Sequence, residues 1–307
     1  MANQIPLLEG TNASGGFLVP DGDGGLVFSR GLNRESAVAT MPGLRVRQVV
    51  GKREKLTEYV GRPTVATVAE GAAKPLTGAE YAQITLDVVK AATIIPYTEE
   101  LLEDAIEDPT VLINQDVRAA FADYIDSNAL GRTSAGAIVG AYNSELAETT
   151  QTVELGTAGD ALAVAISSAM ALIEANGYTP TGAILANDGR AHLRNARGPG
   201  DNAASPLYTN GFSAGTPAEL YVPLRFTTNL STFSGAAAAG RVVGVVGDFT
   251  QAVLGIRKDI TLAFSDQATV GAHNAFEQNK VLSRWEMRTG FVAHDLNRAF
   301  VAIINIV

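Results

Sequence analysis

KAATIIPYTEELLEDA, residues 90–105, is where a strand pattern changes into a helix pattern. The residues from 82 to 98 are rich in β-branched and apolar side chains, which predicts one long strand or two. Thr98 is a good N-cap for the helical stretch EELLEDAIED, and Pro109 is tolerated in the first turn of a second helical segment. The buried face of that segment, 110–130, is expected to hold Val117, Phe121, Tyr124 and Ile125. The pattern therefore predicts a strand that runs into a long helix with an acidic outer face.

Upstream of this junction, residues 44–96 have the pattern of β structure. Residues 44–50 alternate apolar and polar side chains, the period of a half-buried strand. The next stretch, GKREKLTEYVGRP at 51–63, carries four cations against two acids, which is too much charge for a core strand. A turn-rich loop at 70–80 separates it from the strand that begins near 82. The sequence therefore predicts a charged β ribbon near the start of the chain.

Downstream, the sequence predicts a middle of helices and strands and a strand-rich end. Residues 160–177 carry an apolar helical stripe, with Gly177 suited to the helix end, and 181–187 is apolar enough for a buried strand. A short helix at 188–197 and a long loop at 198–217 follow. Further strands are expected at 219–228, 241–247, 252–264, 280–292 and 298–306, the last buried on both faces. The fold class is therefore α+β, with two interleaved domains.

Composition excludes several classes of protein. The 307 residues are 46% hydrophobic and 18% charged, as in a folded protein with a sizeable core. A net charge of −9 argues against a nucleic-acid-binding protein held by a broad basic face. The lack of cysteine excludes disulfides, thiolate zinc sites and thiol catalysis. We see no signal peptide and no apolar run of about 18 residues, so we expect no membrane partner and a chain made in the cytoplasm.

One motif is typical of hydrolases. Residues 211–215 match the G-x-S-x-G nucleophile elbow, and Ser213 is followed by Asp248 and His273 in the order that α/β-hydrolases require. The elbow needs a strand that enters it and a helix that leaves it. The flanks here contain Pro206, Asn210 and Pro217. A flexible loop is therefore the preferred interpretation, and a serine hydrolase using Ser213 is the alternative.

No cofactor or metal site is expected. The histidines, His192, His273 and His294, lack the spacing of a metal site. The DGDGG stretch at 21–25 lacks the spaced oxygen ligands of a calcium loop, and we find no phosphate-binding loop. We therefore expect a protein that is not an enzyme.

The charge pattern is more informative than any catalytic motif. Between residues 45 and 62 the net charge is +4, and between 97 and 126 it is −8. Two solvated faces would explain this pattern. Complementary surfaces are the sharper interpretation, with the basic ribbon of one molecule lying across the acidic helix of its neighbour. The residues expected at this interface are Arg45, Arg47, Lys52, Arg53, Lys55, Arg62, Glu99, Glu100, Glu103, Asp104, Glu107, Asp116 and Asp123.

Several stretches, in order, resemble the major capsid proteins of tailed bacteriophages with the Hong Kong 97 fold. TVATVAEGAAKPLTGAEYAQITL at 64–86 and the junction at 90–105 resemble the family's loop and its entry into a long helix. GVVGDFTQAVLGIRKDITLAFSD at 244–266 is similar to a second block, and FEQNKVLSRWEMRTGFVAHDLNRAFVAI at 276–303 to the terminal strand pair. GGFLVP at 15–20 is similar to the family's opening.

The resemblance implies an architecture. An N-terminal arm would cover 1–40 and an extended β loop 41–80. A discontinuous peripheral domain would comprise 81–155 and 259–307, with a long spine helix at about 98–130. An axial domain would cover 156–258. The basic stretch would then belong to the extended loop, which in this family reaches over an adjacent subunit, and the acidic stretch would contain the spine helix.

The resemblance also implies a function. The chain would self-assemble into pentamers and hexamers that form the icosahedral shell of a virion around double-stranded DNA, without sequence-specific binding. The start at Met1 has no long charged helical segment, so assembly would need a separate scaffolding protein, or the arm and the loop would suffice. A portal and assembly in the bacterial host cytoplasm are also expected. An encapsulin-type nanocompartment shell, which shares this fold, is the alternative.

The family's type member joins its subunits by isopeptide bonds between Lys and Asn side chains, with Glu as base. The matching positions here are Asn279 and Glu286, and the amine would come from Lys52, Lys55 or Lys74. This chemistry needs a neutral Lys in an apolar pocket, which a stretch rich in Arg and Lys does not favour. A surface Asn and an ion-paired Glu are the alternative.

Overall fold

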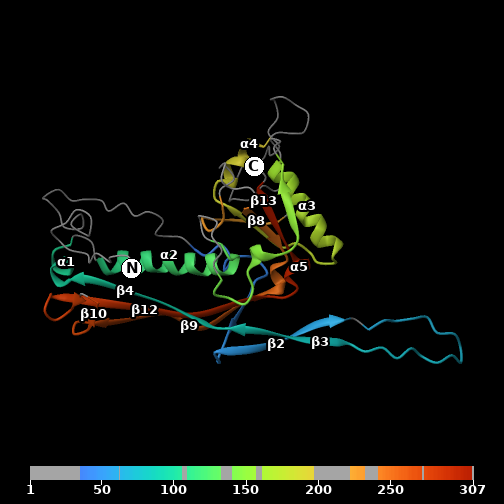
Figure 1. Cartoon of the computed structure of the whole chain (residues 1–307), viewed down its shortest axis with the longest axis horizontal. Coiled ribbons are helices and arrows are strands. Elements are labelled where there is room, and N and C mark those ends of the chain that lie inside the picture. Colours follow the sequence, from blue (N-terminus) through green and yellow to red (C-terminus); the bar gives the residue numbers. More distant parts are fainter. Residues whose placement is uncertain are drawn as a thin grey trace.

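The computed structural model describes residues 35–61, 63–105, 109–132, 140–156, 161–196, 222–231, 241–271 and 273–305. A long flat layer carries a helix along one face, and a compact lobe of sheet and helices stands on one end of it (Figure 1). A two-stranded hairpin projects from the base of the lobe, away from the long helix (Figure 1).

The flat layer is a four-stranded sheet in the order β1-β9-β12-β4. Its strands are β1 (Arg45–Gln48), β4 (Val89–Thr98), β9 (Ala252–Ser265) and β12 (Lys280–Ala293). β12 runs antiparallel to both β4 and β9, and β1 is parallel to β9. The two longest strands, with 14 residues each, give the layer its length. At its far end β10 (Thr269–Val270) pairs with β11 (His273–Asn274).

The junction between strand and helix forms as the sequence predicts. β4 ends at Thr98, and α1 (Glu99–Asp104) begins with the Thr98 hydroxyl accepting the Leu101 N–H at 3.4 Å. α2 (Pro109–Leu130) follows and lies along the sheet (Figure 1). Residues 106–108 are outside the described part of the chain, so the continuity of the 98–130 helix stays a prediction. The stretch 82–98 is two strands, since β3 (Glu80–Asp87) precedes β4.

Helix α2 covers one face of the sheet because its apolar stripe meets an apolar row on β4 and β12. Val117 and Phe121 are buried against Ala91, Trp285 and Met287. Tyr124 and Ile125 pack at the edge of the same cluster, which confirms the predicted face.

The lobe is built on a five-stranded sheet in the order β5-β13-β8-β6-β7. Its strands are β5 (Thr152–Leu155), β6 (Gly182–Ala186), β7 (Leu224–Thr227), β8 (Val242–Gly247) and β13 (Phe300–Asn305). The predicted stripe of α3 (Ala161–Ala175) packs on this sheet, with Ile166 and Ile173 fully buried. The remaining elements are η2 (Leu146–Glu148), α4 (Gly189–Asn195), η4 (Phe249–Gln251) and α5 (Leu296–Ala299).

The two large sheets combine strands from segments that the expected domain boundaries separate. β5 and β13 lie in segments assigned to the expected peripheral domain, 81–155 and 259–307. Both pair in the five-stranded sheet, whose other strands come from the expected axial domain. β9 belongs to the four-stranded sheet from Ala252 onward, ahead of the expected boundary at 259. A strand pattern predicts an extended segment but not its partner, which explains these differences. The expected domain boundaries stay predictions: the arm at 1–40, the extended loop at 41–80, the peripheral domain at 81–155 and 259–307, and the axial domain at 156–258.

Candidate inter-subunit surface

The projecting hairpin consists of β2 (Arg53–Gly61), β3 and the described residues 63–79 between them. It pairs with no other strand of the described chain. Several apolar side chains on it are open to solvent, with Val65 and Leu76 at 96% and 100% exposure. Val60 and Tyr81 are also largely exposed. A charged ribbon is therefore present, as predicted, and its outer part also carries apolar surface.

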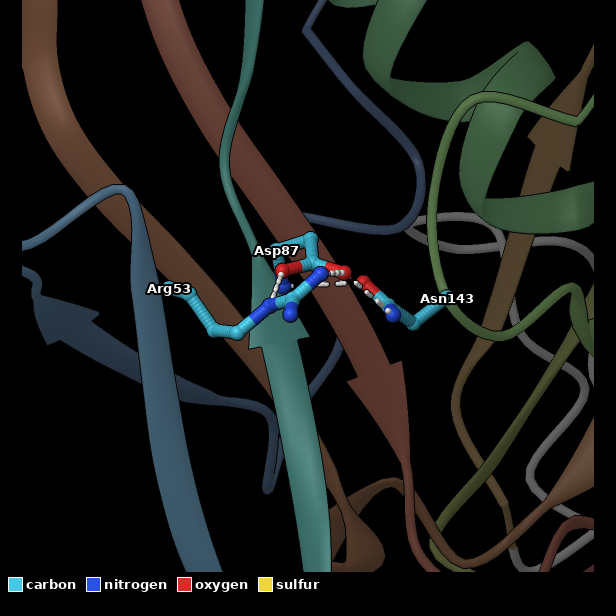
Figure 2. A network of polar contacts seen from close by, with 3 residues as sticks. All are labelled: Arg53, Asp87 and Asn143. Atoms are coloured by element: carbon cyan, nitrogen blue, oxygen red, sulfur yellow. Dashed lines mark hydrogen bonds and ion pairs between the residues drawn. The ribbon is translucent and has the colours of Figure 1, made fainter.

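The root of the hairpin is held by a polar network (Figure 2). Arg53 Nε donates to Asp87 Oδ1 at 2.5 Å, and its Nη2 donates to Oδ2 at 3.2 Å. Asn143 donates from Nδ2 to Asp87 Oδ2 at 3.1 Å and accepts the Asp87 backbone N–H at 2.8 Å. The hydrogen bonds from Arg53 and then Asn143 lower the pKa of Asp87. Both strands of the hairpin are thus joined at their base to each other and to the segment that contains Asn143.

Apolar packing supports the same root. Val49, Leu86, Val88 and Val292 form a small buried cluster between the hairpin and β12. A Cβ at Gly290 would lie 2.2 Å from the Asp87 carbonyl oxygen. Glycine at this position therefore allows the hairpin backbone to approach β12 closely.

The predicted basic residues differ in position and in pairing. Arg45 and Arg47 lie on β1, in the four-stranded sheet rather than in the hairpin. Two cations are paired within the chain, Arg47 with Glu54 at 2.6 Å and Arg53 with Asp87. Lys52 and Lys55 are exposed, and no ion pair joins them to a described residue. Arg62 lies outside the described residues.

The predicted acidic residues also divide. Glu99, Glu100, Glu103 and Asp104 are exposed on α1, and Asp116 is exposed on α2. Asp123 is half-buried, and its carbonyl oxygen accepts the Asn229 side-chain N–H at 3.2 Å. Glu107 lies outside the described residues. The exposed acids are therefore concentrated on α1, at the opposite end of the layer from the hairpin (Figure 1).

Asp126, which was counted with the acidic face, is instead a buried anchor with 1% exposure. Its Oδ1 accepts the Ser36 hydroxyl at 2.6 Å and the Val38 N–H at 3.0 Å. Its Oδ2 accepts the Ala37 N–H at 2.9 Å and the Thr227 hydroxyl at 3.4 Å. The carboxylate therefore joins α2 to the turn at 36–40 and to the end of β7. Counting charges missed this role because Ser36 lies 90 residues away in the sequence.

Glu286, the predicted cross-linking base, lies in a cluster of cations. Its Oε1 accepts from Lys90 Nζ at 2.8 Å and is 3.3 Å from Arg284 Nε, and its Oε2 is 3.8 Å from Lys258 Nζ. The hydrogen bond from Lys90 and the nearby charges lower its pKa. This is the ion-paired arrangement that the alternative anticipated.

The other residues of the predicted cross-link are near the chain surface. Asn279 is in the left-handed region at φ 48°, and its carbonyl oxygen accepts the Glu99 N–H at 3.0 Å. Lys52, Lys55 and Lys74 are exposed. The apolar pocket that an isopeptide reaction needs is therefore not formed around these lysines in the described single chain.

The hydrolase alternative fails on geometry. Asp248 precedes β9 and caps η4 by accepting the Thr250 N–H at 3.0 Å, whereas His273 lies beyond the other end of β9. A strand of 14 residues spans roughly 45 Å, so the two side chains cannot share a catalytic site. Ser213 and the 198–217 loop are outside the described residues.

The side chains of the described segments do not gather into a metal site. No group of three or more His, Asp or Glu side chains there could hold a metal ion. None of the helices found in the same segments has the length and apolar character needed to cross a membrane.

Known proteins with similar sequences are phage capsid proteins. The model of the phage capsid family matches residues 15–303. The probable major capsid protein gp17 of Mycobacterium phage L5 is 28% identical over 273 residues, which cover 82% of this chain and 79% of the relative. The encapsulin and hydrolase alternatives receive no support from these matches.

Solved structures of phage proteins have the same fold. A chain from Mycobacterium phage Bobi aligns with a TM-score of 0.74 at 22% identity, covering 97% of this chain and 99% of the other. A chain from Microbacterium phage Oxtober96 aligns with a TM-score of 0.73 at 22% identity, covering 96% and 99%. The expected α+β fold of the Hong Kong 97 type is thereby confirmed. Because the family model spans nearly the whole sequence, this chain belongs to the phage capsid family.

Proposed function

We propose that this chain is the major capsid protein of a tailed phage, which self-assembles into pentamers and hexamers of an icosahedral shell. The observation that carries this proposal, beside family membership, is the projecting hairpin. A lone two-stranded hairpin is at best marginally stable in water, and this one exposes Val65, Leu76 and Tyr81. Its outer part therefore needs a surface to pack on, and a second copy of the chain supplies one.

Charge complementarity selects the surface on the second copy. Lys52 and Lys55 on the hairpin side would face the exposed acids of α1, chiefly Glu99, Glu100 and Glu103. Arg45 and Asp116 would contribute from β1 and α2. Each exposed ion pair contributes only about 0.2–1 kcal/mol, so these pairs set orientation and register more than affinity. Many modest contacts per subunit then add up to a stable shell.

The shell would enclose double-stranded DNA without reading its sequence, and its role would be structural rather than enzymatic. The net charge of −9 would limit adhesion of DNA to the inner wall during packaging. A separate scaffolding protein and a portal would act in assembly in the host cytoplasm. A strongly basic inner wall in the assembled particle would contradict the proposed role of the net charge.

Electron microscopy of the chain expressed alone tests self-assembly. We expect closed shells or free pentamers and hexamers, and a purely monomeric protein would contradict the proposal. A variant in which a short Gly-Ser turn replaces residues 63–79 should fold, because the removed residues are exposed, but should not form shells. Extraction of long double-stranded DNA from mature particles, rather than a protein cargo, would distinguish a phage capsid from an encapsulin.

A charge exchange tests the interface itself. Lys52→Glu with Lys55→Glu should impair assembly, and adding Glu100→Lys with Glu103→Lys should restore part of it. Glu174→Lys, an equally exposed acid on α3, is the matched control and should leave assembly unchanged. Assembly that tolerates the lysine exchanges without rescue would refute this pairing while leaving the capsid function in place.

A further inference from the structure

The face of the four-stranded sheet that points away from α2 carries charged side chains of β12. Trp285 and Met287 pack against α2 on the near face. Because successive side chains of a strand point to opposite faces, Arg284, Glu286 and Arg288 lie on the far face. One strand thus places two cations and one acid on this face.

The neighbouring strands add two further cations. Arg288 is directly opposite Lys90 of β4 and Lys258 of β9, so three cations form a row across three strands. Like charges that are directly opposite each other destabilise a sheet. Lys90, Lys258, Arg284 and Arg288 together are called the cation cluster below.

A single carboxylate lies among these four cations. Glu286 is 2.8 Å from Lys90, 3.3 Å from Arg284 and 3.8 Å from Lys258. Arg288 takes part in none of these ion pairs, and its buried Nε atom has no hydrogen-bond acceptor among the described residues. Four cations and one acid leave a net charge of +3. An incoming oxyanion would reduce this charge and supply the missing acceptor.

The cation cluster can be reached from solvent. The side chains of Lys90, Lys258 and Arg284 are 47%, 45% and 57% exposed. Asp259 follows Lys258 on β9, and its Oδ1 is engaged with its own backbone, since it accepts the Ile260 N–H at 2.7 Å. The cluster is therefore open to an oxyanion from outside the chain.

The tip of the hairpin carries such a group. Gly61 pairs with Glu80, and further out the Thr77 hydroxyl donates to the Thr64 carbonyl oxygen at 3.3 Å, so the two sides stay matched toward their midpoint at residues 70 and 71. There the Ala72 N–H donates to the Ala69 carbonyl oxygen at 3.0 Å, and Gly71 has a φ of 78°, which is typical of a type II turn. Glu70 is at the first corner of this turn and is exposed.

The tip cannot reach the cation cluster of its own chain. The hairpin projects away from the long helix and from the layer beneath it (Figure 1). Residues 53–70 span roughly 55 Å in the extended form. Lys90 lies just beyond the root, three residues after Asp87. A contact between Glu70 and the cluster must therefore join two molecules.

A carboxylate on a narrow hairpin suits the cation cluster better than the phosphates of DNA do. A duplex would also meet the acidic remainder of the subunit, whose net charge is −9. The hairpin tip brings one carboxylate on a turn with open space around it, because a Cβ built at Gly71 has no neighbour within 4 Å.

We propose that Glu70 of one copy binds the cation cluster of a second copy. Its carboxylate supplies the acceptor that Arg288 lacks and lies between Lys90 and Lys258. This inference rests on the proposed function, in which the hairpin meets a second copy, and it names the group that makes the contact. Because the tip and the cluster are different surfaces, each copy donates one tip and accepts another, an arrangement that can close into rings.

Cross-linking with a carbodiimide tests the contact directly, because this reagent joins a carboxylate to an amine without a spacer. In shells made from mixed isotope-labelled and unlabelled subunits, mass spectrometry should find Glu70 joined to Lys90 or Lys258 in peptides of mixed label. The Glu286–Lys90 pair within one chain, at 2.8 Å, is the positive control. Formation of the control link without any link at Glu70 would overturn the proposal.

A neutral substitution at the tip measures the effect on assembly. Glu70→Gln should raise the subunit concentration needed for assembly by about tenfold, the effect of losing one charge-assisted contact per subunit. Glu80→Gln, an exposed acid nearer the root of the same hairpin, is the matched control and should leave that concentration unchanged. Normal assembly of Glu70→Gln would overturn the tip contact and leave the capsid function in place.

A charge exchange identifies the partner of the tip. Glu70→Arg alone should prevent assembly. Adding Lys258→Glu with Arg288→Glu gives the cluster and Glu286 a net charge of −1, and should restore part of the assembly. Folded subunits of this triple variant that do not assemble would overturn the proposal.

Two further outcomes are distinct. If Arg288→Gln impairs assembly while Glu70→Gln does not, the cluster binds another anion, such as DNA phosphate, and the proposal is wrong. If the unmodified chain forms no oligomer, the proposed function fails instead. Carbodiimide cross-linking of concentrated free subunits would then decide on the tip contact by itself.

Discussion

Asp126 provides the sharpest test of how the described body is held together. Three donors approach its carboxylate within 3.0 Å, namely the Ser36 hydroxyl and the N–H groups of Ala37 and Val38. The site is 1% exposed, so Asp126→Ala leaves these donors buried without an acceptor. Each lost bond to a charged acceptor costs at most about 1.5–3 kcal/mol, and water entering the vacated space recovers part of that cost. We therefore expect a loss of about 3–5 kcal/mol in the free energy of unfolding.

Urea denaturation of unassembled subunits measures this loss. With a slope of about 3 kcal/mol per molar urea, the midpoint should fall by roughly 1–1.7 M. Asp116→Ala, an exposed acid on the same helix, is the matched control and should change the free energy by less than about 0.5 kcal/mol.

Hydrogen exchange gives an independent readout of the same anchor. The amides of Ala37 and Val38 should lose protection in Asp126→Ala and keep it in Asp116→Ala. A loss of stability below about 1 kcal/mol, with protection retained at Ala37 and Val38, would refute the assignment of Asp126 as a buried anchor.

Three further predictions concern the hairpin root and the sheet. Gly290→Ala should lower stability by roughly 1–3 kcal/mol in thermal denaturation, because its Cβ would collide with the Asp87 carbonyl; an unchanged midpoint would contradict the close approach. Folding lowers the pKa of Asp87, so the stability that this carboxylate contributes is lost as the pH falls below about 4. Arg53→Gln should therefore show a smaller drop in melting temperature between about pH 7 and pH 3 than the unmodified chain. An equal drop in both proteins would exclude this linkage. Phe121→Ala should lower the free energy of unfolding by about 3–5 kcal/mol. The fluorescence of the single tryptophan, Trp285, reports the unfolding, because Trp285 packs in the same cluster. A loss under about 1 kcal/mol would show that the packing of α2 does not depend on this contact.

The elements were predictable where one periodicity dominates. The stripes of α2 and α3 and the apolar run of β13 each recur at a spacing that suits one secondary structure, and all three form as expected. The Thr98 cap was predictable because its acceptor and donor lie three residues apart.

Pairings over long separations were not predictable in this way. In the sequence, Asp126 looks like one more solvated acid of an acidic stretch. Only the folded chain brings Ser36 within hydrogen-bonding distance of it. Arg53 and Asp87 meet because the hairpin register places them opposite each other, 34 residues apart in the sequence. β13 could not be assigned to its sheet because a buried strand pattern does not name its neighbours.

The described contacts suggest how one sequence can serve unequal positions in a shell. At the hairpin, the interactions within the chain are concentrated at the root, where Arg53, Asp87 and Asn143 join and Val292 packs. Its outer part has exposed apolar side chains and no strand neighbour among the described residues. Because the hairpin is held at its root and its outer part is free of contacts with other strands, the outer part can adjust to neighbouring subunits in slightly different positions. The core at the root is not disturbed by this adjustment. The hydrogen bonds to Asp126 likewise hold residues 36–38 against α2, in the core of the subunit.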